Sequence, residues 1–347
     1  MSNLFRVTSS PHIKSEKTVT SVMRDVIIAL TPALLGGILF FSLRALVIVL
    51  ISVASCVLFE FLYNLILKKE QHINDLSAVV TGMLIGFNLP VTVPVWLPVI
   101  ASAFAIIVVK MLYGGIGKNI VNPALSGRIF VFISFSGLMT KWIPAGQTIN
   151  KSVLSLPLFK NVDVVSSATP LSYLKNGDAS IVTDVPLINA FSGAVGGCIG
   201  ETSAVLLIVG GIYLLSKKII TWHIPASFIG TVALVTFLFP TVADISRFEF
   251  MCYHLFSGGL MLGAIFMATD YATSPVTPVG RIIYGVGCGL ITVFIRYFGG
   301  YPEGVSFAIL LMNFLTWFID KNTIPTKFGG ENKYAELIGR IKTKIKK

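Results

Sequence analysis

The chain has 347 residues, of which 54% are hydrophobic and only 12% are charged. Soluble domains carry about 25% charged residues, so this chain lacks the polar side chains that would cover a globular surface of its size. Its net charge of +11 does not indicate nucleic-acid binding, because the basic residues gather at the chain ends and in short loops between apolar runs. The composition therefore predicts a polytopic membrane protein whose basic residues meet anionic lipid, with no nucleic-acid partner.

Ten apolar segments predict ten transmembrane helices, since a helix needs about 20 apolar residues to cross a bilayer. The segments are residues 22–41, 45–67, 76–89, 96–113, 124–140, 191–215, 219–239, 251–269, 280–298 and 305–319. Basic residues lie before the first segment and after the last, which places both ends of the chain in the cytoplasm and requires an even number of spans. Ten spans satisfy this requirement and also place the lysines of the short loops inside.

The spans divide the chain into five parts. They are a cytoplasmic N-terminal segment (1–21), a first five-helix membrane unit (22–140), an extracytoplasmic loop (141–190), a second five-helix membrane unit (191–320) and a basic cytoplasmic tail (321–347). The loop is the only long connection, and loops of this length in compact proteins are usually functional or disordered.

The two membrane units resemble each other. Gly82-Met-Leu-Ile-Gly86 recurs as Gly259-Leu-Met-Leu-Gly263, and a proline precedes the fifth span and the tenth span alike. Because five is odd, the second unit is inverted in the membrane, an arrangement that often places a site between interrupted central helices. The expected fold is thus all-α, with about ten transmembrane helices in two inverted five-helix repeats. The glycines fit either a helix break at such a site or close helix packing.

The sequence contains little that indicates a metal or nucleotide site. The four cysteines are far apart and none forms a Cys-x-x-Cys pair, so we predict no disulfide framework, no metal site and no iron–sulfur cluster within this chain. No glycine-rich fingerprint follows a strand, so we predict no NAD site. We also predict no residue that is catalytic by itself.

Four acidic residues lie within or at the edge of predicted spans, where ionisable groups are costly and usually functional. They are Glu60, Asp75, Glu201 and Asp270. One interpretation is an ion pathway, because hard cations prefer oxygen ligands. The other is that these acids pair with cations such as Arg128 or Arg281 near the membrane surface, or contact other subunits.

The extracytoplasmic loop contains the sequence Asp163-Val-Val-Ser166-Ser167-Ala168-Thr169. It resembles the motif Asp-x-x-Ser/Thr-Gly-Ala-Thr/Ser of membrane flavoproteins that the flavin transferase ApbE modifies. The resemblance implies that Thr169 forms a phosphoester with FMN and that Asp163, Ser166 and Ala168 belong to the recognition motif. Ser167 departs from the motif, which has glycine at this position.

The chemistry needs a hydroxyl that the transferase can reach. Small neighbours leave room for a nucleotide, and Pro170 restrains Thr169 to an extended backbone. We therefore expect the Thr169 hydroxyl to be exposed. An ordinary polar loop would also be rich in serine, threonine and proline, so the short motif alone leaves both interpretations open.

Further segments between residues 8 and 320 resemble the D subunit of Rnf complexes and the related B subunit of sodium-pumping quinone reductases. They are Met23-Arg-Asp-Val-Ile-Ile-Ala-Leu-Thr-Pro32, Tyr113-Gly-Gly-Ile-Gly-Lys-Asn-Ile-Val-Asn-Pro-Ala124, Gly200-Glu-Thr-Ser-Ala204, Phe266-Met-Ala-Thr-Asp270 and Tyr301-Pro-Glu-Gly304. The length fits the Rnf D subunit, because the quinone reductase subunit usually has a longer N-terminal extension.

This resemblance implies a bacterial inner-membrane subunit that relays electrons through covalent FMN. The complex would couple electron transfer between ferredoxin and NAD to the outward movement of Na⁺ or H⁺. The implied partners are the other Rnf subunits, above all the G subunit with its own covalent FMN, and ApbE for maturation. A noncovalent riboflavin is implied as a possible second cofactor. A small-solute channel or secondary transporter is the alternative function, because inverted repeats also build such proteins.

Overall fold

The computed structural model describes residues 17–71, 73–143, 168–201 and 203–325, and this part of the chain is helical without β-strands. The first unit consists of α1 (Val19–Phe41), α2 (Leu43–Ile66), η1 (Ile73–Asp75), α3 (Ser77–Phe87), α4 (Trp96–Ala103), which continues as the π-helix η2 (Phe104–Met111), α5 (Pro123–Ser134) and α6 (Ser136–Met139). The connecting segment forms α7 (Pro170–Lys175), α8 (Ile181–Asp184), α9 (Leu187–Ser192) and η4 (Ile199–Glu201). The second unit consists of α10 (Ala204–Ser216), α11 (His223–Leu238), α12 (Arg247–Phe256), α13 (Leu260–Leu262), the π-helix η5 (Gly263–Met267), α14 (Pro278–Phe298) and α15 (Val305–Thr323).

Each predicted span contains at least one of these helices. In the described part, α1, α2 and α14 are long and apolar enough to cross a membrane, and α12 together with residues 260–267 would make a fourth span. Five shorter apolar helical segments accompany them. Helices of this length and composition are consistent with a membrane protein. The number of ten spans stays a prediction.

The sixth predicted span begins later than expected. Helix α10 starts only at Ala204, where Ser203 caps it by accepting a hydrogen bond from the amide of Leu206. Residues 193–198, which we expected to be helical, form an irregular stretch rich in glycine. Glycine loses more conformational freedom in a helix than any other residue, so this stretch stays outside α10 although it is apolar.

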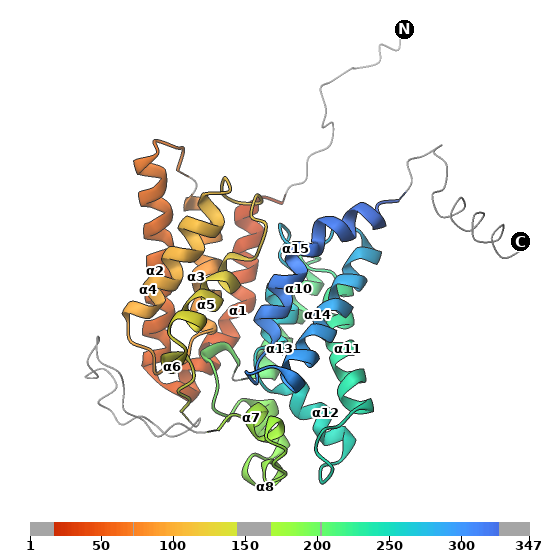
Figure 1. Cartoon of the computed structure of the whole chain (residues 1–347). Coiled ribbons are helices and arrows are strands. Elements are labelled where there is room, and N and C mark those ends of the chain that lie inside the picture. The colour runs from red at the N-terminus through yellow and green to blue at the C-terminus, as the bar shows by residue number, and fades with distance from the viewer. Residues whose placement is uncertain (1–16, 72, 144–167, 202, 326–347) are drawn as a thin grey trace, which may run out of the picture.

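The two units lie side by side, with α1 to α6 on the left and α10 to α15 on the right of Figure 1. In the first unit α2 packs on α3 and α4, and in the second α11 packs on α12 and α14. The units meet where α1 packs against α10 and where α5 packs against α15. The two units thus share part of their packing pattern, and the inverted repeat stays a prediction.

The glycines of the two units have different structural roles. In the second unit the chain bends by 61° between α12 and residues 260–267, at Gly258 and Gly259, so the helix is interrupted there. In the first unit Gly82 lies within α3, where a β-carbon would stand 2.5 Å from the Cα atom of Val53 in α2. Close packing therefore explains Gly82, and a helix break explains the pair at 258–259.

Replacing Gly210 by alanine is expected to push α10 away from α1 and to lower the stability of the protein. A β-carbon at Gly210 in α10 would clash with the backbone carbonyl oxygen of Ala29 in α1, which cannot rotate away. Overpacking of this kind costs about 1–3 kcal/mol, and thermal unfolding of the purified protein in detergent measures it. The control is Gly230→Ala, which meets nothing within 4 Å and gains the same helix propensity. Equal stability of the two variants would contradict the close approach of α1 and α10.

The start of α1 and the end of α15 lie at the same end of the bundle, and α7 and α8 lie at the opposite end (Figure 1). At the first end Lys17 donates to the carbonyl oxygen of Lys217, and Thr20 donates to that of Asn74. The loops after α2 and α10 therefore share this end with the start of α1.

Candidate functional site

Thr169 is the N-cap of α7. Its backbone is extended, with φ −81° and ψ 154°, as the following Pro170 predicts. Its Oγ1 atom accepts a hydrogen bond from the amide of Ser172 at 3.3 Å, which satisfies one of the amides at the start of the helix. Asp163 and Ser166 lie outside the described residues.

The expectation of an exposed hydroxyl is wrong for this conformation, because Thr169 is only 7% exposed. Helix α7 buries Leu171 and Leu174 in a small core with Phe250 and Tyr253 of α12. This packing draws Thr169 against the rest of the protein. The preceding Ala168 is exposed, so Thr169 lies at the boundary between the surface and the interior.

Two carboxylates line the small pocket beside Thr169. The pocket has a volume of about 10 Å³, and its walls include Glu201, Glu303 and Gly258. Glu201 belongs to η4, and Glu303 precedes α15. The pocket therefore lies where the second unit meets the connecting segment.

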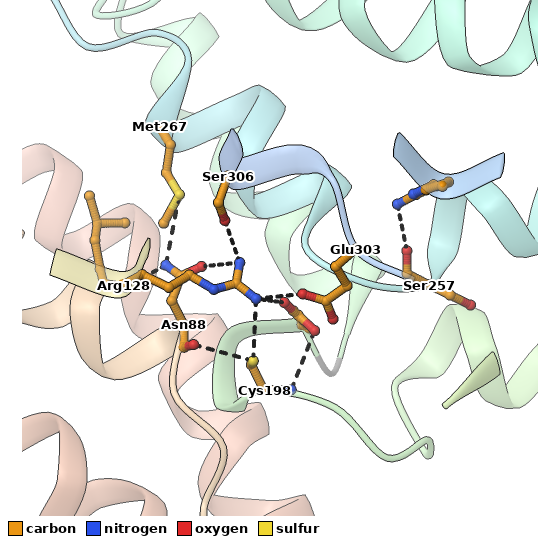
Figure 2. A network of polar contacts seen from close by, with 10 residues as sticks. Asn88, Arg128, Cys198, Ser257, Met267, Glu303 and Ser306 are labelled. Atoms are coloured by element: carbon orange, nitrogen blue, oxygen red, sulfur yellow. Dashed lines mark hydrogen bonds and ion pairs between the residues drawn. The ribbon is translucent and has the colours of Figure 1, made fainter. Parts of the chain in front are cut away.

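Arg128 holds both carboxylates (Figure 2). Its Nη2 atom lies 3.3 Å from Glu201 Oε1 and makes a shorter contact with Glu303 Oε2. Its Nη1 atom donates to Asn88 Oδ1 at 3.0 Å and to Ser306 Oγ at 2.6 Å. We call these five residues the Arg128 network. It joins the end of α3 and α5 of the first unit to η4 of the connecting segment and to the start of α15 in the second unit, so one buried cation connects both units to the wall of the Thr169 pocket.

Glu60 and Asp75 belong to a second buried polar chain. Lys110 Nζ, in the π-helix η2, lies 2.7 Å from Glu60 Oε2 and donates to Ser77 Oγ at 2.6 Å. Ser77 Oγ in turn donates to Asp75 Oδ1 at 2.6 Å. Of the four predicted acids, Glu60 and Glu201 thus have cationic partners in the structure, Asp75 is joined to Lys110 through Ser77, and Asp270 accepts from Thr273 Oγ1 at 3.0 Å.

The sequence prediction omitted Glu303 and Lys110. Glu303 lies in the segment Tyr301-Pro-Glu-Gly304, outside every predicted span, and Lys110 lies inside the predicted span 96–113, near its end. A lysine near the end of a span is normally assigned to the membrane surface, and only the acidic residues of the spans were singled out. The structure buries Lys110 instead, at 3% exposure, and a search for unpaired charges within apolar runs would have found it.

A cavity of about 490 Å³ opens between the units at the end where α1 begins. This volume falls within the range of about 300–1,000 Å³ that is typical of ligand pockets. Most of its walls are apolar, from α1, α3, α10 and η5. The polar side chains include Lys110, Asn119, Asn122 and Asp270.

Comparison with known proteins places the chain among membrane redox subunits. The D subunit of the Na⁺-translocating ferredoxin:NAD⁺ oxidoreductase complex of Acetobacterium woodii is 46% identical over 324 residues, which cover 93% of this chain and 95% of the relative. The D subunit of the proton-translocating ferredoxin:NAD⁺ oxidoreductase complex of Clostridium ljungdahlii is 40% identical over 333 residues, covering 94% and 97%. The D subunit of the ion-translocating oxidoreductase complex of Aliivibrio salmonicida is 35% identical over 350 residues, covering 94% and 98%.

The family model described as the NQR2, RnfD, RnfE family matches residues 6–329. This range includes both membrane units, the connecting segment with Thr169 and both buried polar networks. The relatives match over nearly their whole lengths, so the similarity is not confined to one motif. The chain belongs to the NQR2, RnfD, RnfE family.

Proposed function

We propose that this chain is the membrane flavoprotein subunit of an ion-translocating ferredoxin:NAD oxidoreductase, in which FMN esterified to Thr169 relays electrons. The observation that carries the proposal is the position of Thr169. Thr169 is the N-cap of α7 and lines a pocket together with Gly258, where the second unit's helix is interrupted. Glu201 and Glu303, which belong to the Arg128 network, line the same pocket. Relatives that match nearly the whole chain are subunits of such complexes by name.

The residues around Thr169 fit an attached nucleotide in part. The extended backbone and the glycines at positions 196, 197 and 258 leave space close to the hydroxyl. The pocket itself, at about 10 Å³, cannot hold a flavin ring. An attached flavin would therefore need its ring outside this pocket, or a displacement of α7. FMN, once attached, supplies one-electron transfer, and the chain supplies its anchor and its orientation.

The large cavity fits a second, noncovalent flavin. Its apolar walls suit a planar ring, and Lys110, Asn119 and Asn122 supply polar groups that could meet the edge of the ring. We propose riboflavin as the occupant. Such a flavin would lie at the end of the bundle opposite α7, so the chain would carry one redox group near each end.

The topology that accompanies this function is ten spans in two inverted repeats in the bacterial inner membrane, with both termini cytoplasmic. This topology is supported by the positions of the described chain ends, which lie at one end of the bundle, whereas α7 and α8 lie at the other (Figure 1). The matching contacts within each unit support the repeat. In this orientation Thr169 faces outward, where the G subunit would exchange electrons with it and ApbE would attach the FMN.

Flavin fluorescence tests the central proposal. The full-length chain is coexpressed with ApbE, separated on a denaturing gel and examined for a fluorescent band. Mass spectrometry of the peptide spanning residues 163–171 should then show the mass of one FMN on Thr169. A dark band from a strain that flavinylates another known target would defeat the proposal.

The cavity also favours a second candidate function, a small-solute channel or secondary transporter. A pocket of about 490 Å³ between two similar units is the arrangement expected of such a protein. Liposomes that contain the purified chain without FMN would then take up small solutes. The electron-relay proposal expects no uptake above that of empty liposomes.

Asp270→Asn is expected to lower ion transport by about tenfold or more. Asp270 lines the large cavity, and an interaction with a charged group is worth about 1.5–3 kcal/mol. Transport of Na⁺ or H⁺ into membrane vesicles during electron transfer measures the effect. The control is Asp244→Asn, which neutralises an exposed carboxylate before α12. Unchanged transport in Asp270→Asn would remove this residue from the pathway.

A further inference from the structure

Helix α7 covers the Thr169 hydroxyl in this conformation. Thr169 Oγ1 bonds the Ser172 amide, and the residue is only 7% exposed, whereas the preceding Ala168 is exposed. The pocket beside Thr169, at about 10 Å³, has room for about one water molecule. An enzyme that brings a nucleotide to this hydroxyl therefore cannot reach it while α7 is docked.

A few side chains hold α7 in its docked position. Leu171 and Leu174 insert into the small core that α12 shares with the connecting segment, and Lys175 donates to the carbonyl oxygen of Gly299. Leu171 lies directly on Gly258, where a β-carbon would stand 2.7 Å from Leu171 Cδ1. A helix of six residues is too short to be stable by itself. The position of α7 therefore depends mainly on the burial of two leucine side chains.

Docking of α7 also buries polar groups that lack partners. A pocket of about 60 Å³ lies under the helix, with walls that include Leu171 and Leu174 of α7, His254 of α12 and Arg296 of α14. His254 Nε2 and Arg296 Nε are buried and make no hydrogen bond among the described residues. A buried polar group without a partner destabilises the state that buries it. Because α7 forms a wall of this pocket, undocking would let water reach both atoms and would offset part of the lost leucine burial.

An exposed joint connects α7 to α8. Residues 176–178 are exposed, and Gly177 has a φ of +72° with nothing within 4 Å of the place of a β-carbon. Beyond the joint the chain is fixed, because Ile181 is fully buried and Tyr253 Oη donates to the carbonyl oxygen of Val185 at 2.7 Å. Loop residues of this kind absorb the backbone rotation when a neighbouring element moves. Helix α7 can therefore swing away while the segment after it stays in place.

We propose that α7 is a lid over Thr169, which undocks from α12 and α14 to present the hydroxyl to the flavin transferase. This inference rests on the proposed function, in which FMN is esterified to Thr169. In the unmodified chain the undocked state is a minority population, because it exposes Leu171 and Leu174. After modification the pocket of about 10 Å³ has no room for the nucleotide, so α7 no longer returns to its docked position. Modification thus changes the lid from mostly closed to open.

Cysteine labelling measures the opening of the lid without any flavin. The full-length variants Thr169→Cys and Ala168→Cys are purified in detergent and treated with a maleimide, and mass spectrometry follows the label. Thr169→Cys should react at least tenfold more slowly than Ala168→Cys, because its reaction follows the population of the open state. Adding Leu174→Ala to Thr169→Cys should raise the rate at least tenfold, since it removes much of the apolar burial that docks α7. Adding Val182→Ala, in an exposed position of α8, should change the rate less than twofold.

The native cysteines report on global unfolding, because all four are buried. They are Cys56, Cys198, Cys252 and Cys288, and they should stay unlabelled in every variant. If Leu174→Ala exposes them, Leu174→Val replaces it and should raise the labelling rate several-fold. Equal rates for Thr169→Cys and Ala168→Cys would show that α7 is not docked. A rate that does not respond to Leu174 would show that undocking does not uncover Thr169, and either result overturns the lid.

Delayed expression of ApbE connects the lid to the modification. The full-length chain with Thr169 in place is produced first, its synthesis is stopped, and ApbE is then induced. The Leu174→Ala variant should become fluorescent several-fold faster than the wild type, and Val182→Ala should match the wild type. Equal rates for all three would show that the transferase does not depend on opening, which overturns the lid. A wild-type chain that stays dark defeats the proposed function itself, whereas the labelling rates do not depend on flavin.

Hydrogen exchange tests the open state of the modified chain. The amides of residues 171–175 should exchange at least tenfold faster in the flavinylated full-length chain than in the unmodified one, because α7 is undocked. The amides of α11, which lies away from α7, should exchange equally in both samples and serve as the control. Unchanged exchange in α7 would show that the helix docks again over the nucleotide, which overturns this part of the inference.

Discussion

The Thr169→Val variant is expected to lose all covalently bound flavin while it still inserts into the membrane. Valine has nearly the shape of threonine but no hydroxyl, so no phosphoester can form. The variant also loses the acceptor for the Ser172 amide, which costs about 1 kcal/mol as for other N-caps. That cost falls on the six-residue helix α7 and leaves the long apolar helices intact. In-gel fluorescence and the amount of protein in the membrane fraction measure the two parts of the result.

Two control variants separate the ester from the cap. Thr169→Ser keeps both the hydroxyl and the cap, so its fluorescence should stay near that of the wild type. Ser172→Ala keeps the hydroxyl of Thr169 and the amide that bonds it, so it too should remain fluorescent. Persistent fluorescence in Thr169→Val would move the attachment to another residue.

Replacing Arg128 by methionine is expected to destabilise the protein by about 3–5 kcal/mol, the usual cost of breaking a buried ion pair by removing one partner. Methionine would leave the carboxylates of Glu201 and Glu303 near the interior without a cation, since their side chains are 2% and 17% exposed. It would also remove the hydrogen bond to Asn88 within the first unit and the hydrogen bond to Ser306, which joins the two units. Thermal unfolding in detergent should show a large fall in Tm.

A combined variant tests whether unpaired charge causes this loss. Adding Glu201→Gln and Glu303→Gln to Arg128→Met removes every charge of the network together. Removing one partner of a buried ion pair is costly because it leaves an uncompensated buried charge, and the triple variant leaves none. The triple variant should therefore recover part of the lost Tm. A triple variant that is no more stable than Arg128→Met would show that packing of the arginine, and not charge, matters.

Long uninterrupted apolar runs made part of this fold predictable. Helices α1, α2 and α14 lie within a few residues of the predicted spans, because hydropathy alone determines them. The bend at Gly258 and Gly259 was indicated by the repeat, but the same pattern marked Gly82, which instead packs against α2. Residues 193–198 were wrongly placed in a span, because an apolar run does not reveal which of its glycines leave the helix.

The candidate site was predictable only where local chemistry decides it. The extended backbone of Thr169 follows from Pro170, whereas its burial depends on Leu171 and Leu174, which pack against residues distant in the sequence. The pairing of Arg128 with Glu201 was one of the alternatives. The contribution of Glu303 comes from a segment that no local pattern connects to Arg128.

The Arg128 network also bears on how the two units move. A carrier that exposes its site to each side of the membrane in turn must separate its halves in every cycle. Here the interface between the halves is closed by the buried Arg128 guanidinium, which bonds Glu201 of the connecting segment and Glu303 and Ser306 at the start of α15. Opening that interface would break these buried ion pairs in each turnover. An electron relay has the reverse requirement, because tunnelling rates fall steeply with distance and a fixed spacing between redox centres keeps them constant. The buried ion pairs between the units therefore favour a rigid electron relay over a transporter whose halves move apart.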